Sequence, residues 1–168
     1  MTTIVHRPLT PEEARQVHQA LRDTPNILGY TVRELLRLTD VFVAEEDGIF
    51  AGLCFSADMG RHWSEIAALL VLPHFQGRGL GNALFSAAWD RAWRRGRHIY
   101  VLSRNLQVVG WMEARGMEVG TTGWKLPGAV HWHLARHMAS GHRWREGFRK
   151  RQAIRACPPL IQGIKRQW

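Results

Sequence analysis

The chain has 168 residues and a formal net charge of +9, with 45% hydrophobic and 22% charged residues, values typical of a globular domain with a substantial core. No apolar run is long enough to cross a membrane, and the first residues lack the pattern of a signal peptide, so we expect a cytoplasmic protein without a membrane partner. Two cysteines are too few for a disulfide framework or a four-cysteine metal site.

The first half of the sequence predicts one strand, two helices and then three strands. Two capping boxes, Thr10 to Glu13 and Thr31 to Glu34, mark the beginnings of the helices. The turn Glu45–Gly48 separates the first two of the three later strands, and the apolar run Ile66–Leu72 forms most of the third. In chain order, the expected elements cover residues 4–8, 10–25, 31–38, 41–44, 49–55 and 65–72.

The second half of the sequence predicts alternating helices and strands. A helix is expected over 80–96, a strand over 98–102, a helix over 105–115, and strands over 117–124 and 130–138. The resulting order, β-α-α-β-β-β-α-β-α-β-β, predicts a mixed α/β sheet with helices on its faces.

The last of these strands is predicted from an alternation of side chains. Val130 and Trp132 would lie on one face, and His131, His133 and His137 on the other. The histidine spacing invites a zinc site, but no nearby cysteine or carboxylate completes one. We therefore expect an exposed polar face and no metal.

A glycine-rich segment joins the strand at 65–72 to the helix at 80–96. Gly77, Gly79 and Gly81 let consecutive backbone N–H groups converge on an anion, and the start of the helix adds its partial positive charge. No lysine follows these glycines, which excludes a P-loop. The Gly-x-Gly-x-Gly spacing, with Tyr100 where an acidic residue would stand, excludes a dinucleotide fold.

The segment from Gln76 to Gly81, preceded by Val71-x-Pro73, resembles the Gln/Arg-x-x-Gly-x-Gly/Ala signature of the GNAT acyltransferase superfamily. Asn105 and the Gly116-Met117 pair resemble a second, weaker pattern of that family. The resemblance covers residues 1–138. It implies a mainly antiparallel sheet that is splayed between the strands at 65–72 and 98–102, with helices on both faces.

By this resemblance, the protein is an enzyme, an N-acyltransferase that moves an acetyl or related acyl group from acetyl-CoA, or another acyl-CoA, to an amine. No metal is implied. Main-chain groups would hold the pantetheine arm, backbone N–H groups would hold the pyrophosphate, and Asn105 would contact the cofactor from the other side. The main-chain groups for pantetheine belong to Leu70, Val71 and Leu72, and those for pyrophosphate to Gln76, Gly77, Arg78, Gly79, Leu80 and Gly81.

Acyl transfer to an amine needs a base, because a primary amine with a pKa near 10 is mostly protonated at pH 7. Glu65 stands eleven residues before Gln76, the spacing of the catalytic glutamate in some family members, and it is our candidate. The family's usual tyrosine acid is replaced by Met112, which cannot donate a proton. The thiolate could leave unassisted, or the protein could be a non-catalytic acyl-CoA-binding module.

The acceptor pocket implied by the resemblance would include aromatic residues, here Tyr30, His62, Trp63 and Trp124, although any of these tryptophans could equally fill the core. The acceptor would be a small amine, a peptide or a protein.

The net charge is concentrated at the C-terminal end, because residues 136–168 hold nine of the 23 Lys and Arg residues and only Glu146 as an acid. We therefore separate an acyltransferase domain, residues 1–138, from a basic extension, residues 139–168, expected to be a helix and then a tail. The extension could bind nucleic acid or another polyanion, with aminoacyl-tRNA or a nucleic-acid-associated protein as acceptor. Alternatively, it is a solvated segment that completes the fold or a homodimer.

Overall fold

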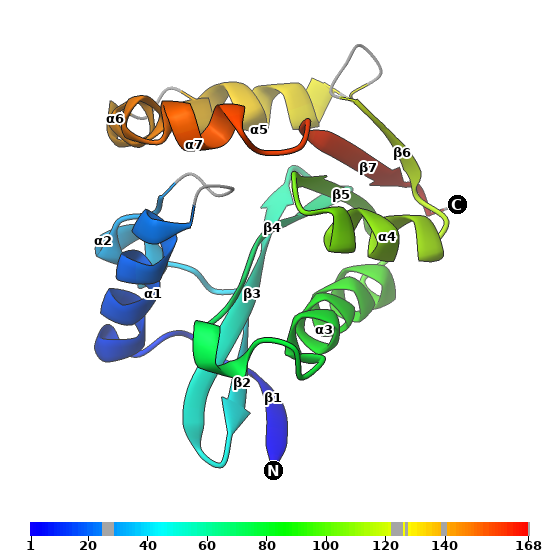
Figure 1. Ribbon diagram of the computed structural model, residues 1–168. Coiled ribbons are helices and arrows are strands. Elements are labelled where there is room, and N and C mark those ends of the chain that lie inside the picture. Colours follow the sequence, from blue (N-terminus) through cyan, green and yellow to red (C-terminus); the bar gives the residue numbers. More distant parts are fainter. Residues whose placement is uncertain (25–28, 122–125, 127, 139–140, 168) are drawn as a thin grey trace.

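In a computed structural model, the chain forms a seven-stranded sheet with helices on both faces (Figure 1). The structure describes residues 1–24, 29–121, 126, 128–138 and 141–167. The strands are β1 (Thr2–His6), β2 (Val41–Glu46), β3 (Ile49–Met59), β4 (Trp63–Val71), β5 (His98–Ser103), β6 (Glu118–Thr121) and β7 (Ile161–Lys165). The helices are α1 (Pro11–Asp23), α2 (Val32–Leu35), α3 (Leu80–Arg94), α4 (Leu106–Ala114), α5 (Gly128–Met138), α6 (Gly141–Arg149) and α7 (Arg151–Arg155), with a short 3₁₀ helix, η1 (Pro73–Phe75).

The strand order is β1-β2-β3-β4-β5-β7-β6, and every neighbouring pair is antiparallel except β4 and β5. The parallel pair is short, since only Trp63–Ile66 is matched with His98–Val101. Beyond Ile66, β4 continues alone on that side, so the two strands separate. This confirms the predicted fold class, a mixed and mainly antiparallel sheet that is splayed at β4 and β5.

Both predicted capping boxes form and begin the helices where expected. The hydroxyl of Thr10 accepts from the N–H of Glu13 while the Glu13 carboxylate accepts from the N–H of Thr10, and Thr31 and Glu34 repeat the pattern at α2. Ala14, Val17 and Leu21 of α1 are buried against the sheet side that also buries Leu35 of α2. Local capping determines where these helices begin, and their apolar faces determine which side packs against the sheet.

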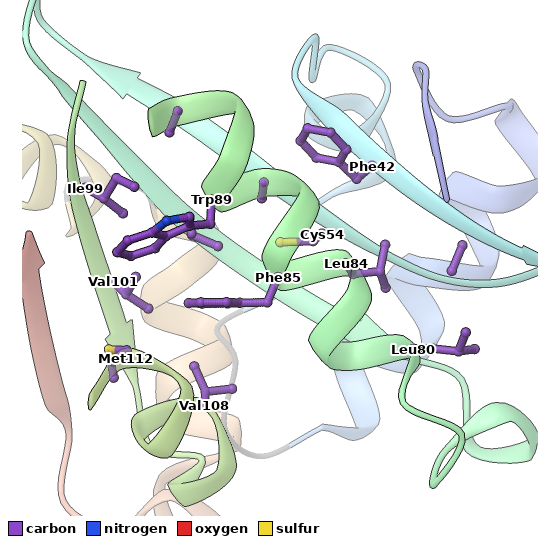
Figure 2. Packing of buried hydrophobic residues seen from close by; sticks show 14 of the residues in the cluster. Phe42, Cys54, Leu80, Leu84, Phe85, Trp89, Ile99, Val101, Val108 and Met112 are labelled. Carbon is purple, nitrogen blue, oxygen red and sulfur yellow. The ribbon is translucent and has the colours of Figure 1, made fainter. Parts of the chain in front are cut away.

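Helix α3 packs on the other face of the sheet (Figure 2). Leu84, Phe85 and Trp89 recur at helical spacing and are all 8% exposed or less. They contact side chains of β2, β3 and β5 and of α4, including Met112, which is fully buried. The core therefore holds the start of α3 in a fixed position beside the end of β4.

One predicted strand was wrong, because residues Gly128–Met138 form helix α5. The apolar and polar residues of this segment alternate over a few positions only, and the same residues also fit helical spacing, in which Val130 and His133 share one face. The last strand of the sheet is instead β7, and it lies within the segment expected to be a tail. β7 inserts between β5 and β6 and pairs with both.

The basic segment before β7 packs against the body of the protein. Lys150 is buried, and its Nζ donates to the carbonyls of Leu21 and Thr24 at the end of α1. Arg149 donates to the carbonyl of Arg22 at 2.8 Å. These cations face the negative end of the α1 dipole and satisfy carbonyls that the helix leaves free. Among the described residues, no helix is long and apolar enough to span a membrane.

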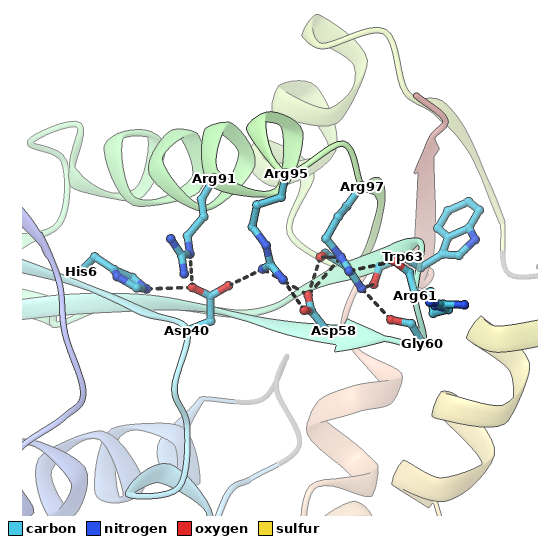
Figure 3. Close-up of polar contacts among 10 residues, drawn as sticks. His6, Asp40, Asp58, Gly60, Arg61, Trp63, Arg91, Arg95 and Arg97 are labelled. Atoms are coloured by element: carbon cyan, nitrogen blue, oxygen red, sulfur yellow. Dashed lines mark hydrogen bonds and ion pairs between the residues drawn. The ribbon is translucent and has the colours of Figure 1, made fainter. Parts of the chain in front are cut away.

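A charged network ties the end of α3 to the sheet (Figure 3). Asp40 accepts from Arg91 at 2.5 Å and pairs with Arg95 at 3.5 Å. Asp58 accepts from Arg95 at 2.5 Å and pairs with Arg97 at 3.2 Å. The network lies at the end of α3 that is far from the glycine-rich segment. We therefore expect it to stabilise the fold and not to take part in the site.

Candidate active site

A cavity of about 960 Å³ opens where β4 and β5 separate. Its walls come from the separated part of β4, from the glycine-rich segment with the start of α3, and from the end of β5 with α4. Two further regions also line it. One is the region around Thr24 and Tyr30, and the other is Ile154 and Leu160 of the C-terminal segment. The cavity thus joins elements from both ends of the chain.

One end of the cavity is lined by backbone with the geometry expected of an anion cradle. Gly77 and Gly79 have φ angles of 79° and 80°, in the left-handed region that favours glycine, and both line the cavity. Gly79 also precedes the first turn of α3 without any side-chain cap, so the N–H groups of that turn stay available. A Cβ at Gly81 would lie 3.1 Å from the ring of Trp111, so glycine lets this turn approach α4 closely.

Two residues of the predicted cradle are arranged differently from the rest. The N–H of Gln76 donates to the carbonyl of Pro73, and its side chain donates to the carbonyl of Val71 at 3.0 Å. The Arg78 guanidinium pairs with Glu46 at 2.8 Å and is not among the cavity-lining groups. The part of the predicted cradle left available at the cavity is therefore the left-handed glycines and the first N–H groups of α3.

Main-chain groups of β4 face the cavity beyond Ile66, where β4 is no longer paired with β5. The N–H of Leu72 donates to the carbonyl of Ala51 on the β3 side. Because main-chain groups alternate along a strand, the groups of Val71 point to the open side. Leu70 and Val71 line the cavity, whereas Leu72 is buried outside it. Of the three residues predicted to hold pantetheine, Val71 is the one best placed to use its main chain.

Asn105 lies across the cavity from β4. It begins helix α4, where its side-chain oxygen accepts from the N–H of Gln107 at 2.9 Å, and it lines the cavity. Its backbone N–H donates to the hydroxyl of Ser103 at 3.1 Å. The Asn105 side chain thus caps the start of α4 beside the cavity.

Glu65 lines the other end of the cavity. Its side chain is 10% exposed, and its Oε2 lies 2.9 Å from Nε2 of His133 on α5. A buried carboxylate needs such a partner, because desolvation without one is costly. Sequence reasoning missed this contact because it placed His133 on a strand.

Tyr100 and Met112 are two residues to consider as proton donors at this site. Tyr100 is matched with Glu65 in the parallel register, and its buried hydroxyl has no hydrogen-bond partner among the described residues. Burial, and next the charge of Glu65, raise the pKa of Tyr100. Met112, at the position of the family's usual acid, is fully buried and does not line the cavity. Ser103 and Tyr30 are residues with hydroxyl groups that do line it.

The predicted acceptor residues are only partly brought together. Tyr30 lines the cavity and packs edge-on against Phe55. Trp63 is buried at the start of β4 against the His98 ring, and His62 lies in the preceding turn; the structure places neither in the cavity wall. Trp124 is outside the described residues. No local sequence signal could have assigned Ile154 and Leu160 to this wall, since long-range packing of the C-terminal segment brings them there.

A family model described as the acetyltransferase (GNAT) family matches residues 10–117. Over 84 residues, the chain is 37% identical to L-methionine sulfoximine/L-methionine sulfone acetyltransferase of Salmonella typhimurium (strain LT2), a match that covers 47% of this chain and 48% of the relative. The matched region thus spans about half the length of this curated relative.

Solved structures share the fold. N-acetylglutamate synthase from Neisseria gonorrhoeae, complexed with coenzyme A and N-acetylglutamate, matches with a TM-score of 0.71 and 19% identity over 100% of this chain and 35% of that protein. Diaminobutyrate acetyltransferase from Paenibacillus lautus, in complex with L-2,4-diaminobutyric acid and coenzyme A, matches with a TM-score of 0.61 and 14% identity over 99% and 96% of the two chains. Because the family model covers more than half of the sequence, the chain belongs to the GNAT acetyltransferase family.

Proposed function

We propose that the protein transfers an acetyl or related acyl group from acyl-CoA to the amine of a small molecule. The observation that carries the proposal is that one cavity contains a backbone anion site at one end and the carboxylate of Glu65 at the other. An anion site alone would suit many phosphate-containing ligands, and a carboxylate alone would suit many bases. Their combination in one cavity suits a phosphorylated acyl donor whose reactive end reaches a base.

The residues present fit acyl-CoA. Gly77, Gly79 and the start of α3 offer converging N–H groups for a diphosphate. The N–H of Val71, on the side of β4 that β5 leaves open, offers a hydrogen bond to an amide-containing arm, and Asn105 lines the same cavity at the start of α4. When bound, acyl-CoA supplies the activated acyl group as a thioester.

Glu65 supplies the base. The acceptor amine arrives mostly as an ammonium ion at pH 7, since its pKa is about 10, and it must lose a proton before it can attack. Glu65 and Val71 are six residue steps apart on the extended strand, a distance of roughly 20 Å along β4. One cavity spans both positions and can hold an extended donor with its thioester next to the amine, and this positioning contributes much of the rate enhancement.

The departing thiolate needs no tyrosine. Its pKa is about 8.5, as for a free thiol, so it leaves without a strong acid. The hydroxyl of Ser103 lines the cavity and accepts from Asn105, which leaves its hydrogen free to donate. Met112 therefore does not argue against catalysis, and the enzyme is favoured over a non-catalytic binding module.

A small amine is favoured over a nucleic-acid-bound acceptor. Lys150 and Arg149 bind carbonyls of α1, and Lys165 donates to the carbonyl of Gly116 at 3.0 Å. Part of the basic charge in the C-terminal segment is therefore used within the protein. Ile154 and Leu160 of that segment add apolar surface to the cavity, as suits a small acceptor.

Thiol release from acetyl-CoA over a panel of small amines, amino acids, peptides and tRNA tests the function. We expect turnover with at least one small amine and a fall of about 100-fold or more in kcat for Glu65→Gln, in the range of general-base contributions. The affinity for acetyl-CoA, measured by calorimetry, should change less than about 2-fold. Glu12→Gln, an exposed change on α1, is the matched control. Tight CoA binding without turnover for any amine would refute the enzyme in favour of the binding module.

A further inference from the structure

Helix α5 brings a histidine to the candidate base, and this contact is the starting point. Nε2 of His133 lies 2.9 Å from Oε2 of Glu65, with side chains that are 17% and 10% exposed. The two residues are 68 positions apart in the sequence, so the fold, not the local chain, creates the pair.

The position of His133 is fixed by the packing of α5. Val130 is fully buried in a cluster with Met59, Trp63, Tyr100 and Ile164. His133 follows Val130 by three positions, so it lies on the same face of the helix and points to the sheet. The apolar anchor thus holds the imidazole over Glu65.

The two residues have different access to their surroundings. Glu65 lines the cavity, whereas His133 is not among the described residues that line it. His133 therefore stands behind the carboxylate as seen from the acceptor, and it keeps a partial exposure on the α5 side. A proton that Glu65 takes up from the cavity can therefore pass to a hydrogen-bonded neighbour on the side away from the cavity.

Tyr100, the other polar neighbour, cannot take this proton. Its hydroxyl is fully buried beside Glu65, has no described hydrogen-bond partner, and already carries its own proton, because burial and the Glu65 charge raise the pKa of the phenol. An imidazole ring can act as a general base or as a proton shuttle in proteins.

We propose that His133 is a positioning residue that orients the Glu65 carboxylate toward the cavity and takes over the proton that Glu65 receives from the acceptor. The inference rests on the proposed acetyltransferase function. An ammonium acceptor and acetyl-CoA yield an amide, free CoA thiol and one proton: the C–N bond forms, the C–S bond breaks, and the second amine proton ends on the thiol. The proton left over is the one that passes from Glu65 to His133 and then to solvent.

The kinetic test uses Glu65→Gln, His133→Gln and the double variant, with acetyl-CoA and the best amine of the panel. A glutamine in place of His133 offers a hydrogen bond but cannot take a proton, so we expect kcat to fall roughly 10-fold, within the range of coupled residues, with KM for acetyl-CoA unchanged. The double variant should be no slower than Glu65→Gln within about 2-fold. His131→Gln, an exposed change on the same helix, is the matched control and should keep wild-type kcat.

Wild-type kcat for His133→Gln, or losses that multiply in the double variant, would overturn the pair while leaving the acetyltransferase in place. Absence of turnover with every amine would overturn the proposed function and, with it, the proton path. A second readout needs no acceptor: in ¹⁵N-histidine-labelled protein, the Nε2 signal of the His133 ring should shift in Glu65→Ala, because its hydrogen-bond partner is lost. Identical His133 ring signals in the two proteins would also overturn the proposal.

Discussion

Gly52 on β3 offers a direct test of how closely β4 must approach its neighbour beside the cavity. The residue is matched with Val71, and a Cβ there would lie 2.5 Å from the carbonyl oxygen of Leu70 and 3.0 Å from Cα of Val71. Both atoms belong to the backbone and cannot rotate away. In Gly52→Ala, the two strands must therefore separate by about 1 Å to restore normal van der Waals contact.

The cost follows from this overlap. Forcing one methyl group into a packed site costs roughly 1–3 kcal/mol, and replacing glycine lowers the entropy of the unfolded chain, which offsets about 0.4–1 kcal/mol. We expect Gly52→Ala to lower the free energy of unfolding by about 1–2 kcal/mol. Because the displaced residue is Val71, the affinity for acetyl-CoA should fall as well.

Urea unfolding followed by fluorescence measures the first effect, and calorimetry with acetyl-CoA the second. Gly120→Ala on β6 is the matched control, since a Cβ there meets nothing within 4 Å. It should leave both quantities unchanged or raise stability slightly. A Gly52→Ala protein as stable as wild type would refute the close approach of the two strands.

Three further outcomes follow from contacts described above. Lys150→Met should lower the free energy of unfolding by about 1–3 kcal/mol in urea melts, because it leaves carbonyls at the end of α1 without their buried donor. Burial raises the pKa of the Cys54 thiol, so a thiol reagent should label Cys157 alone in native protein and both after unfolding, as read by mass spectrometry. Burial alone would raise the pKa of Asp58, but hydrogen bonds from Arg95 and Ser64 prevail and lower it. The ionised Asp58 carboxylate therefore stabilises the fold above about pH 4, and this contribution is lost as the pH falls further. Asp58→Asn should accordingly make the free energy of unfolding, measured by urea melts, depend less on pH below about pH 4.

Much of the fold could be predicted because its signals are local. The boxes at Thr10 and Thr31, the glycines at 77 and 79, and the apolar face of α3 each specify their own element. The segment at 130–138 was misread because a short alternation of apolar residues and histidines fits either a strand or one helix face. The strand Ile161–Lys165 gave no signal, since it follows two prolines within a basic stretch and is stabilised by its partners β5 and β6.

The candidate site could be predicted only where it depends on one segment. The anion cradle and Glu65 belong to consecutive stretches of chain, so motif and spacing were enough to propose them. The partner of Glu65, the anchoring of α5 and the cavity wall at Leu160 depend on contacts between distant segments. Reading the helix spacing from Val130 would have placed His133 on the buried face, but not against Glu65.

The insertion of β7 between β5 and β6 has a consequence for biosynthesis. β6 is synthesised about forty residues before β7. Until β7 has been made, β6 has no strand to pair with, and one edge of β5 is open. A nascent or truncated chain that ends before residue 161 would expose both, and exposed strand edges promote aggregation. The sheet can therefore be completed only after residues 161–165 have been made, so its assembly depends on β7.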